Sequence, residues 1–307
     1  MLPHRTDVES AAARLGEKIR HTPTLVLHGD ELDVPFRIVL KLELLQHTGS
    51  FKARGALNSV MSLPREVQSV AAASGGNHGA AVAWAAQRTG IVADVFAPAS
   101  ATPVKLERIR EYGGRLHTVD GDVGDALEAC RELCEREDVP LVHPYDTVET
   151  VCGAGTVGLE IGEAVPDAEL VLVGCGGGGL YTGLTAALGD TVPVQPVETE
   201  LCPHLHVARE AGAPVPHSSA GAAADSLGPP QIGQLAYETA AKHDTTSLLV
   251  TEEEAAVARR FLWERVRVLA EPGASVALAA VMAGKVDARH GSSVVVVVSG
   301  GNNPSIP

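Results

Sequence analysis

Short apolar runs rich in Val and Ala alternate along the chain with longer segments whose apolar residues recur every three to four positions. The short runs have the length and β-branched content of buried strands, and the longer segments have the period of helices. The predicted strands span residues 38–40, 70–72, 92–96, 170–173, 194–197 and 294–298. The predicted helices include residues 79–88, 103–112, 126–135 and 181–188. This alternation predicts an α/β protein with a mostly parallel sheet covered by helices.

One further predicted helix has a clear start signal. Thr251 is followed three residues later by Glu254, a capping box in which hydroxyl and carboxylate satisfy two backbone N–H groups. A stripe of apolar residues then continues from 258 to 269. By contrast, residues 212–230 are rich in Gly, Ala, Pro and Ser, which predicts a long loop, either a linker or a surface excursion within one domain.

Composition and charge exclude several classes of partner. The 307 residues include 24 Lys and Arg against 38 Asp and Glu, a formal net charge of −14. A chain this acidic, without a Lys/Arg run, repels phosphate backbones, so we expect neither nucleic acid nor an anionic membrane surface as a partner. No apolar stretch approaches the roughly 20 residues of a membrane span, and no signal peptide is recognisable. The five cysteines lack metal-ligand spacing, so we expect a cytoplasmic protein with reduced thiols and no metal site.

A glycine-rich loop follows one of the predicted strands. Residues 174–180 read Gly-Cys-Gly-Gly-Gly-Gly-Leu and precede a predicted helix. Consecutive glycines let backbone N–H groups converge on an anion, and the helix N-terminus adds partial positive charge, so the loop predicts a phosphate site. Gly174, Gly176 and Gly179 also satisfy the dinucleotide pattern G-x-G-x-x-G, and Glu198 follows about 20 residues later. A nicotinamide-dependent oxidoreductase is therefore a competing interpretation.

Two more segments place polar groups among small residues. Residues 74–79, Ser-Gly-Gly-Asn-His-Gly, leave a predicted strand and open a helix, so their side chains and amides are suited to a carboxylate. In residues 48–56, Thr-Gly-Ser-Phe-Lys-Ala-Arg-Gly-Ala, Lys52 has small and apolar neighbours. Burial would lower the pKa of this amine and make it a nucleophile. The plain alternatives are local capping by Asn77 and His78 and an ordinary solvated lysine.

These segments together carry a family resemblance. Residues 48–56, 74–79, 176–180 and 299–302 (Ser-Gly-Gly-Asn) occur in the order and spacing of fold-type II pyridoxal-phosphate enzymes. Within that group the chain resembles the serine/threonine dehydratase (ammonia-lyase) family. The S-F-K-x-R-G-A segment is specific, and its joint occurrence with S-x-G-N-H-G and S-G-G-N makes a chance similarity improbable.

The resemblance implies an architecture. It is that of tryptophan synthase β-like enzymes, with two open, mostly parallel α/β domains. Residues 1–68 and 147–307 would form the large cofactor-binding domain, and residues 69–146 a small domain that closes over the substrate. Family members usually form dimers, so we expect a homodimer.

The resemblance also assigns roles at the site. Lys52 would form the Schiff base with pyridoxal 5′-phosphate and later act as the base at the substrate Cα. The glycines would cradle the phosphate, Asn77 would bind the ring 3′-oxygen, and Ser299 would meet the ring nitrogen. The residues expected to bind the cofactor are Lys52, Asn77, Gly176, Gly177, Gly178, Gly179, Leu180 and Ser299. Those expected to bind the substrate are Ser50, Ser74, Gly75, Asn77 and His78.

The implied reaction is the dehydration and deamination of a β-hydroxy L-amino acid, L-threonine or L-serine, to a 2-keto acid and ammonia. A neutral hydroxyl at the ring nitrogen, that of Ser299, favours loss of the β-hydroxyl over transamination. A β-replacement enzyme and a hydroxyaspartate dehydratase are the alternatives. The nicotinamide-dependent oxidoreductase becomes remote, because it explains one loop and leaves Lys52 and Ser299 without a role.

A few positions depart from the family pattern. Gly75 stands where serine racemases of the family carry a second serine, so elimination is expected to dominate over racemisation. Asp225 matches an aspartate of the racemase cation site, with Glu198 as a neighbour, but the acidic residue shortly before it is missing, and no metal is assigned. Cys175 adjoins the phosphate loop and is either a redox-sensitive thiolate or, the favoured interpretation, a small apolar filler.

Overall fold

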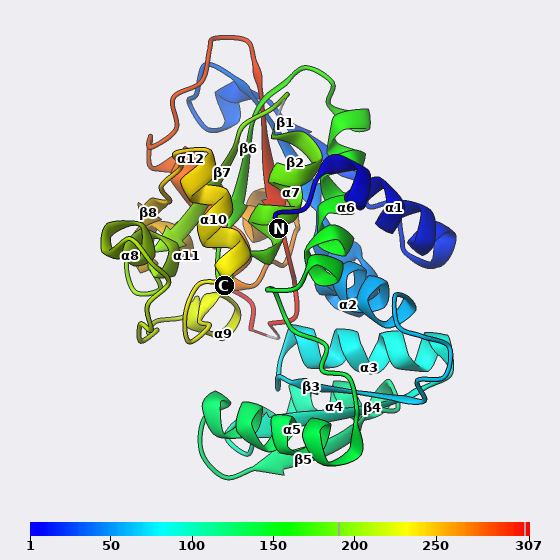
Figure 1. Cartoon of the computed structure of the whole chain (residues 1–307). Coiled ribbons are helices and arrows are strands. Elements are labelled where there is room, and N and C mark those ends of the chain that lie inside the picture. The colour runs from blue at the N-terminus through cyan, green and yellow to red at the C-terminus, as the bar shows by residue number, and fades with distance from the viewer. Residues whose placement is uncertain (190, 304) are drawn as a thin grey trace.

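The computed structural model describes residues 1–189, 191–303 and 305–307. Within these residues the strands form a six-stranded sheet, in the order β1-β2-β9-β6-β7-β8, and a three-stranded sheet, β3-β4-β5 (Figure 1). All pairings are parallel except that of β1 with β2. The strands are β1 (Thr24–Leu27), β2 (Arg37–Leu42), β3 (Ser69–Ala73), β4 (Val92–Pro98), β5 (Arg115–Val119), β6 (Ala168–Gly174), β7 (Val194–Thr199), β8 (Leu248–Val250) and β9 (Ser293–Val298).

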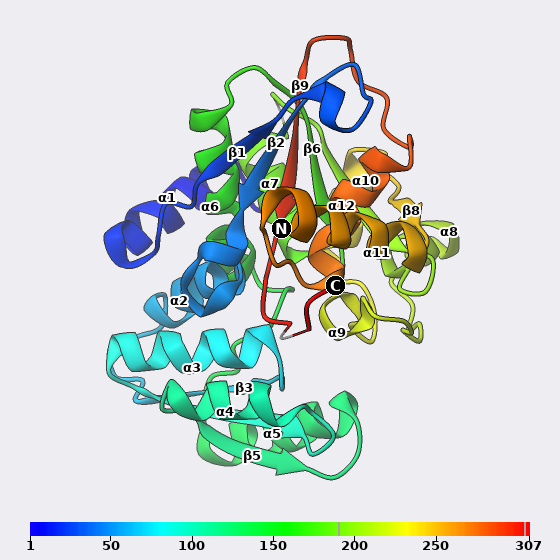
Figure 2. The same ribbon diagram turned by 180° about the vertical axis from the view of Figure 1, so that it is seen from behind.

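Helices cover both faces of the six-stranded sheet, with α11 and α12 on one side and α1, α6, α7 and α10 on the other (Figures 1 and 2). The helices are α1 (Arg5–Leu15), α2 (Lys52–Met61), α3 (Asn77–Thr89), α4 (Pro103–Glu111), α5 (Val123–Glu137), α6 (Val148–Ala164), α7 (Gly179–Leu188), α8 (His204–Ala211), α9 (Ala224–Leu227), α10 (Gln234–Lys242), α11 (Glu252–Phe261) and α12 (Pro272–Met282). This three-layer arrangement is the one that the strand and helix alternation predicted.

The valine run of β9 shows why the central strands were easy to recognise. Val294, Val296 and Val298 pack against the core that contains α12, and Val295 and Val297 pack against the core that contains α6 and α7. Every residue of the strand is buried. A parallel strand with both faces covered has no polar side, so its sequence is continuously apolar instead of alternating.

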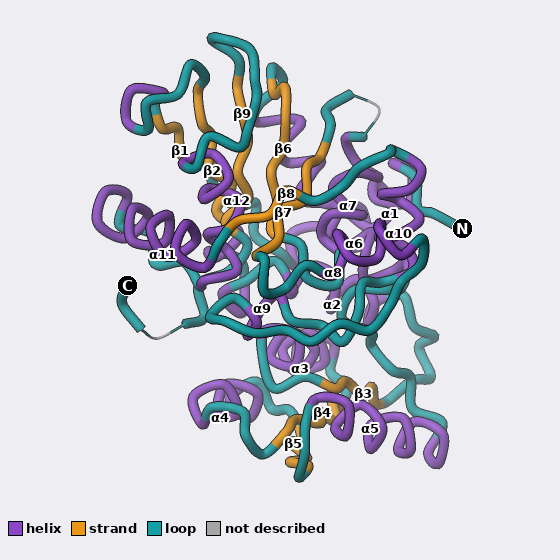
Figure 3. Tube along the Cα trace, turned by 90° about the vertical axis from the view of Figure 1, so that its left-hand side faces the viewer, coloured by secondary structure: helices purple, strands orange, loops and turns teal. Residues whose placement is uncertain are grey.

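The three-stranded sheet forms a second layered unit, and α3 lies between it and the rest of the chain (Figures 1 and 3). Helix α3 packs on α2, and α5 packs on the opposite face of the small sheet against β3 and β4. All three strands lie within residues 69–146, the segment predicted to be the small domain. The boundaries of that domain stay a prediction.

Glycines bring three helices into close main-chain contact. A Cβ added at Gly55 in α2 would lie 2.7 Å from the Thr150 carbonyl oxygen in α6. Likewise, a Cβ at Gly155 in α6 would lie 2.6 Å from the Gly183 carbonyl oxygen in α7. Side chains at these positions would force the helices apart. Helices α2, α6 and α7 therefore form one stack with backbone against backbone.

Two predicted features differ in the structure. The capping box of Thr251 and Glu254 is present, but α11 ends at Phe261 and continues as a π-helical turn, Leu262–Val266. The chain then leaves the helix because Arg267 adopts φ of 62°, so the stripe to residue 269 is not one helix. Residues 212–230 contain α9, and Leu227 is buried in the core of the six-stranded sheet, so the linker interpretation is wrong and the segment is a surface excursion.

Hydropathy along the helices gives one further result. In the part of the chain that the structure describes, no helix combines the length and the apolar character needed to cross a membrane.

Candidate active site

Lys52 lies at the start of α2, where the chain leaves a short turn next to β9. Its Nζ donates a hydrogen bond to the Pro144 carbonyl oxygen at 2.6 Å and lies 5.0 Å from the centre of the Phe51 ring. Burial lowers the pKa of Lys52 to about 8, and the nearby Glu271 carboxylate offsets part of this shift. A substantial fraction of the amine is therefore neutral near physiological pH, as a nucleophile and base requires.

Two neutral imidazoles flank this amine. The buried ring of His78 donates from Nε2 to the Val142 carbonyl oxygen at 2.8 Å, and burial, followed by the Lys52 charge, lowers its pKa to about 3. His143 Nδ1 accepts the backbone N–H of Asp146 at 2.9 Å, and burial again lowers its pKa. Because His78 already uses its N–H, its Nδ1 is an acceptor, so its backbone amide is the group suited to a carboxylate.

The turn at residues 74–79 lies across from Lys52 at the N-terminus of α3. The Gly76 N–H donates to Ser74 Oγ at 3.2 Å, which shapes the turn. A Cβ added at Gly75 would lie 2.8 Å from the Ala101 Cβ and 3.2 Å from the Ala97 Cβ. The position that carries a second serine in serine racemases is thus filled by alanine methyl groups in this chain.

Asn77 joins the turn to the last segment of the site. Its Nδ2 donates to Glu271 Oε1 at 2.8 Å, and its Oδ1 accepts from Asn302 Nδ2 at 2.7 Å. Burial raises the pKa of Glu271 to about 7. Next to them, the Phe51 N–H donates to the Ser299 carbonyl oxygen at 3.0 Å, so Ser299 lies beside the turn that carries Lys52. The segments around residues 52, 77 and 299 therefore meet, as the sequence predicted.

The glycine loop leaves β6 and opens α7 at Gly179. Gly178 adopts φ of 84°, a left-handed conformation that other residues rarely take. The far side of the loop is covered, because a Cβ added at Gly177 would overlap the Tyr145 ring and one at Gly178 would lie 2.2 Å from the Ala236 Cβ. The loop thus combines a helix N-terminus with closely supported backbone amides, the features of an anion site.

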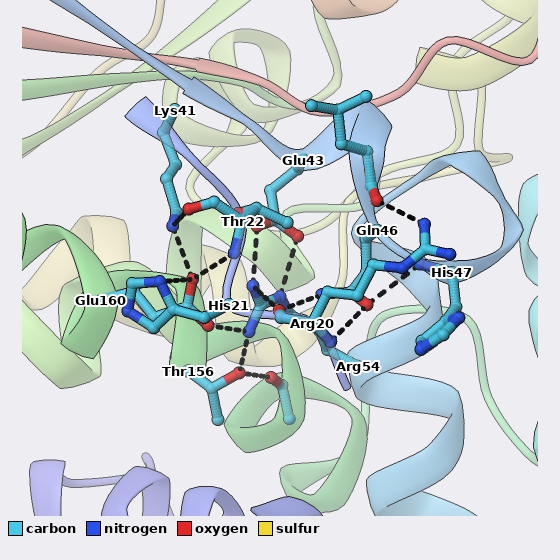
Figure 4. A network of polar contacts seen from close by, with 12 residues as sticks. Arg20, His21, Thr22, Lys41, Glu43, Gln46, His47, Arg54, Thr156 and Glu160 are labelled. Atoms are coloured by element: carbon cyan, nitrogen blue, oxygen red, sulfur yellow. Dashed lines mark hydrogen bonds and ion pairs between the residues drawn. The ribbon is translucent and has the colours of Figure 1, made fainter. Parts of the chain in front are cut away.

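Arg54 is held beneath the site by a buried group of charges (Figure 4). Its guanidinium donates to both oxygens of Glu43 at 2.8 Å and to Glu160 Oε1 at 2.6 Å. Lys41 Nζ donates to the second Glu160 oxygen at 2.5 Å. Two positive and two negative side chains thus balance in the interior. They fix the first turn of α2, two residues after Lys52, to β2 and α6.

Glu198 does not have the role that a dinucleotide site would give it. The carboxylate is fully buried and accepts the backbone N–H groups of Leu205 and His206, at 2.8 and 3.0 Å, and the Ser247 hydroxyl. Burial raises its pKa to about 7. Glu198 therefore caps α8 and faces no open groove, so the nicotinamide interpretation is wrong.

The two carboxylates compared with the racemase cation site have other partners in the structure. Asp225 is paired with Lys105 on α4. No group of three or more His, Cys, Asp or Glu suited to a metal ion occurs within residues 1–189, 191–303 and 305–307. Asp225 is thus engaged with a lysine, and Glu198 with the end of a helix.

Of the two interpretations of Cys175, the structure favours a small apolar residue that fills space. It is 1% exposed, and burial raises the pKa of its thiol well above the ordinary range. A neutral, enclosed thiol is a poor nucleophile, so the redox-sensitive thiolate is wrong. The charge of an anion at the glycine loop would raise this pKa further rather than lower it.

The sequence did not predict the roles of Pro144 and Tyr145. The Pro144 carbonyl oxygen accepts a hydrogen bond from Lys52, and the Tyr145 ring packs behind the glycine loop. The sequence also did not predict the role of Arg108, which donates to Asn302. No local signal marks these residues, because each acts on a partner at least 30 positions away in the chain. Only the packing of the two sheets brings them to the site.

Fold and site together define an α/β protein with a partly buried amine at the start of one helix and a glycine-rich loop at the start of another. The chain belongs to the family of pyridoxal-phosphate dependent enzymes, whose sequence profile matches residues 16–300. This confirms fold type II and pyridoxal phosphate as the cofactor.

Individual relatives narrow the class to lyases. The L-threonine ammonia-lyase of Geobacter sulfurreducens is 35% identical over 98% of this chain and 76% of its own length. The phenylserine dehydratase of Ralstonia pickettii is 33% identical over 98% of this chain and 94% of its own length. The solved threonine deaminase of T.th. superimposes with a TM-score of 0.91 at 31% identity, covering 99% of this chain and all of that one. The predicted pyridoxal-phosphate-dependent lyase is thus confirmed.

Proposed function

We propose that this chain converts a β-hydroxy L-amino acid, L-threonine or L-serine, to a 2-keto acid and ammonia. The single observation that carries the proposal is the Lys52 amine, which is desolvated, with a pKa of about 8, at the point where the three motifs meet. Support also comes from the relatives, two of which are named for threonine and phenylserine. The substituents of these amino acids at Cβ include the hydroxyl that a dehydratase removes.

The side chains at the site fit pyridoxal 5′-phosphate. Thr48 Oγ1 and Ser50 Oγ are buried next to Lys52 and have no hydrogen-bond partner among the described residues, so donors are available to a bound group. The glycine loop offers amides to a phosphate. We assign cofactor binding to Lys52, Asn77, Gly176, Gly177, Gly178, Gly179, Leu180 and Ser299.

Each residue then has a task in the reaction. When bound, pyridoxal phosphate supplies an electron sink that stabilises negative charge at the substrate Cα. Lys52 Nζ removes the proton from that carbon, and its low pKa leaves it neutral enough to do so. Ser299 presents a neutral hydroxyl to the ring nitrogen, which favours rapid departure of the β-hydroxyl. Gly75 has no side chain to act as a second base, and a Cβ added there would press on the Ala97 and Ala101 methyl groups.

Substrate binding is assigned to Ser50, Ser74, Gly75, Asn77 and His78. Ser74 and the amides of the turn at the start of α3 would hold the carboxylate, and the buried Ser50 Oγ, which has no hydrogen-bond partner among the described residues, would be a further donor. Because the turn lies within residues 69–146, carboxylate binding would draw this part of the chain over the site and exclude water. The homodimer and the cytoplasmic location expected from the sequence stay predictions.

The proposal is tested by measuring 2-keto acid released from L-threonine and L-serine by the cofactor-loaded protein. We expect 2-oxobutanoate and pyruvate, respectively, with ammonia in equal amounts. Two parallel assays use hydroxyaspartate alone and serine acylated on its side-chain oxygen together with a thiol. Product from hydroxyaspartate alone would contradict threonine and serine as the substrates. A thioether product from the acylated serine alone would show that the reaction is β-replacement and not elimination.

The pKa of Lys52 makes the attachment of the cofactor depend on pH. Only the neutral amine attacks the cofactor aldehyde, so attachment to the cofactor-free protein should rise with pH through a midpoint near 8. An ordinary lysine would give a midpoint near 10.5. Borohydride trapping followed by mass spectrometry measures the adduct, and the Lys52→Ala variant gives the background from surface lysines. A midpoint near that of an ordinary lysine would contradict the desolvation argument.

A further inference from the structure

Helix α4 reaches across from the small sheet to the other half of the molecule with two cations one turn apart. Lys105 pairs with Asp225 on α9, and the Arg108 guanidinium donates to Asn302 Oδ1 in the segment after β9. These partners lie 120 and 194 positions away in the chain. The two links join the small sheet to the segments that surround the cofactor site.

The contact of Arg108 settles the orientation of one amide. A carboxamide has an acceptor end and a donor end, and exchanging them reverses every hydrogen bond it makes. Because Arg108 can only donate and the Thr48 carbonyl oxygen can only accept, the two contacts together fix Oδ1 of Asn302 toward Arg108. The Nδ2 of Asn302 then faces two acceptors, the Thr48 carbonyl oxygen and Asn77 Oδ1, each at 2.7 Å.

The same reasoning carries to the next amide. With its Oδ1 occupied by Asn302, Asn77 must turn its Nδ2 to Glu271 Oε1, which accepts at 2.8 Å. One N–H of that Nδ2 is used, and the second stays available to an acceptor in the site. If the amide were reversed, Asn77 would present an oxygen to the cofactor oxygen and to the Glu271 carboxylate.

The charge on α4 is distributed unequally. Lys105 pairs with Asp225, and Arg110 pairs with Glu107 on the surface, at 3.1 Å. Arg108 has no carboxylate within ion-pair distance among the described residues, and its guanidinium is half-buried against a neutral amide. A cation placed on an amide in this way gains less from charge pairing than Lys105 does, but it imposes a direction on the amide.

We infer that Arg108 is a positioning residue that fixes, through Asn302, which end of the Asn77 amide faces the cofactor. The inference rests on the proposed role of Asn77. It follows that docking of α4 on the segment after β9 also orients the Asn77 amide that faces the cofactor. Lys105, by contrast, docks the helix on Asp225 and acts on the Asn77 partner Glu271 only through its charge, so it does not set the direction of either amide.

The test uses cofactor titrations and absorption spectra of purified variants. Arg108→Ala is expected to weaken cofactor binding about tenfold, and to shift its absorption maximum, because the removed group is a charged hydrogen-bond donor. Asn302→Ala should give the same shift, and the double variant should be no worse than either. Arg108→Lys, which retains one donor, should recover part of the affinity. Arg110→Ala on the same helix is the matched control and should match the wild type.

Several outcomes would overturn the inference. These are an Arg108→Ala variant that binds the cofactor like Arg110→Ala, losses that add fully in the Arg108/Asn302 double variant, or a Lys105→Ala variant that shifts the spectrum as much as Arg108→Ala. The last result would mean that helix docking alone is responsible. Keto-acid release is measured only on the wild type, so failure of the proposed reaction is recognised separately from failure of the relay.

Discussion

Replacing Lys52 by alanine is expected to abolish keto-acid release, with a loss of at least roughly 10⁴-fold even when the cofactor is supplied in excess. The variant loses both the amine that attaches the cofactor and the base that acts at Cα. Neither neighbouring imidazole can replace it. Burial lowers the pKa of His78 to about 3, so its free Nδ1 is too weak a base, and His143 Nδ1 is occupied by backbone N–H groups.

The same variant should remain folded, which separates loss of chemistry from loss of structure. Burial lowers the folded-state pKa of Lys52 to about 8 from 10.5, so the folded protein releases this proton more readily than the unfolded chain. The charged amine therefore opposes folding below pH 8, and this cost fades as the pH rises toward 10.5. At neutral pH we expect Lys52→Ala to unfold at the wild-type temperature or above it.

Keto-acid assays with added cofactor, and thermal unfolding followed by circular dichroism, measure the two effects. The exposed Lys242 on α10 provides the matched control, since Lys242→Ala removes the same group away from the site. Activity of the Lys52→Ala variant within about tenfold of the wild type would contradict the assignment of Lys52 as the base.

The second large effect is expected at Arg54. Arg54→Ala leaves the buried carboxylates of Glu43 and Glu160 with one ammonium, that of Lys41, between them. Breaking a buried ion pair by removing one partner costs about 3–5 kcal/mol, because the remaining charge has lost its water and its partner. We expect a loss of this size in the free energy of unfolding, together with weaker cofactor attachment, since α2 begins at Lys52.

Urea unfolding of the two forms measures this loss. Arg131→Ala is the matched control, because Arg131 is an exposed arginine within 3.9 Å of Glu128, and surface pairs of this kind contribute roughly 0–1 kcal/mol. Arg54→Lys keeps the charge without the two-pronged geometry, so it should fall between the wild type and Arg54→Ala. An Arg54→Ala variant as stable as Arg131→Ala would show that the buried group carries no stability.

The predictability of the fold follows from how completely each strand is buried. Residues 294–298 were recognisable because both faces of β9 are covered and every side chain is apolar. By contrast, β5 (Arg115–Val119) was missed, because it lies at an edge of the small sheet and includes the half-exposed His117. The edge strand β1 and the three-residue β8 were missed for related reasons, since neither has a long buried run.

The site was predictable as far as each motif carries its own chemistry. The turn at Lys52, the turn at 74–79 and the glycine loop each combine small residues with a helix start, and that pattern is local. Glu198 was misread because its spacing from the loop fits a ribose ligand, whereas its actual partners are the amides of α8. Such partners depend on tertiary packing, and spacing along the chain does not contain that information.

The glycine stack of α2, α6 and α7 also sets the precision of the active site. Lys52 begins the first of these helices and the glycine loop opens the third, and at Gly55, Gly155 and Gly183 the interfaces between them are main chain against main chain. The glycines at these contacts bring the backbones together without a side chain of their own, so no rotamer change at these positions can alter the separation of the amine and the glycine loop. Substitutions in the substrate pocket can therefore change substrate specificity without changing the distance between Lys52 and the glycine loop.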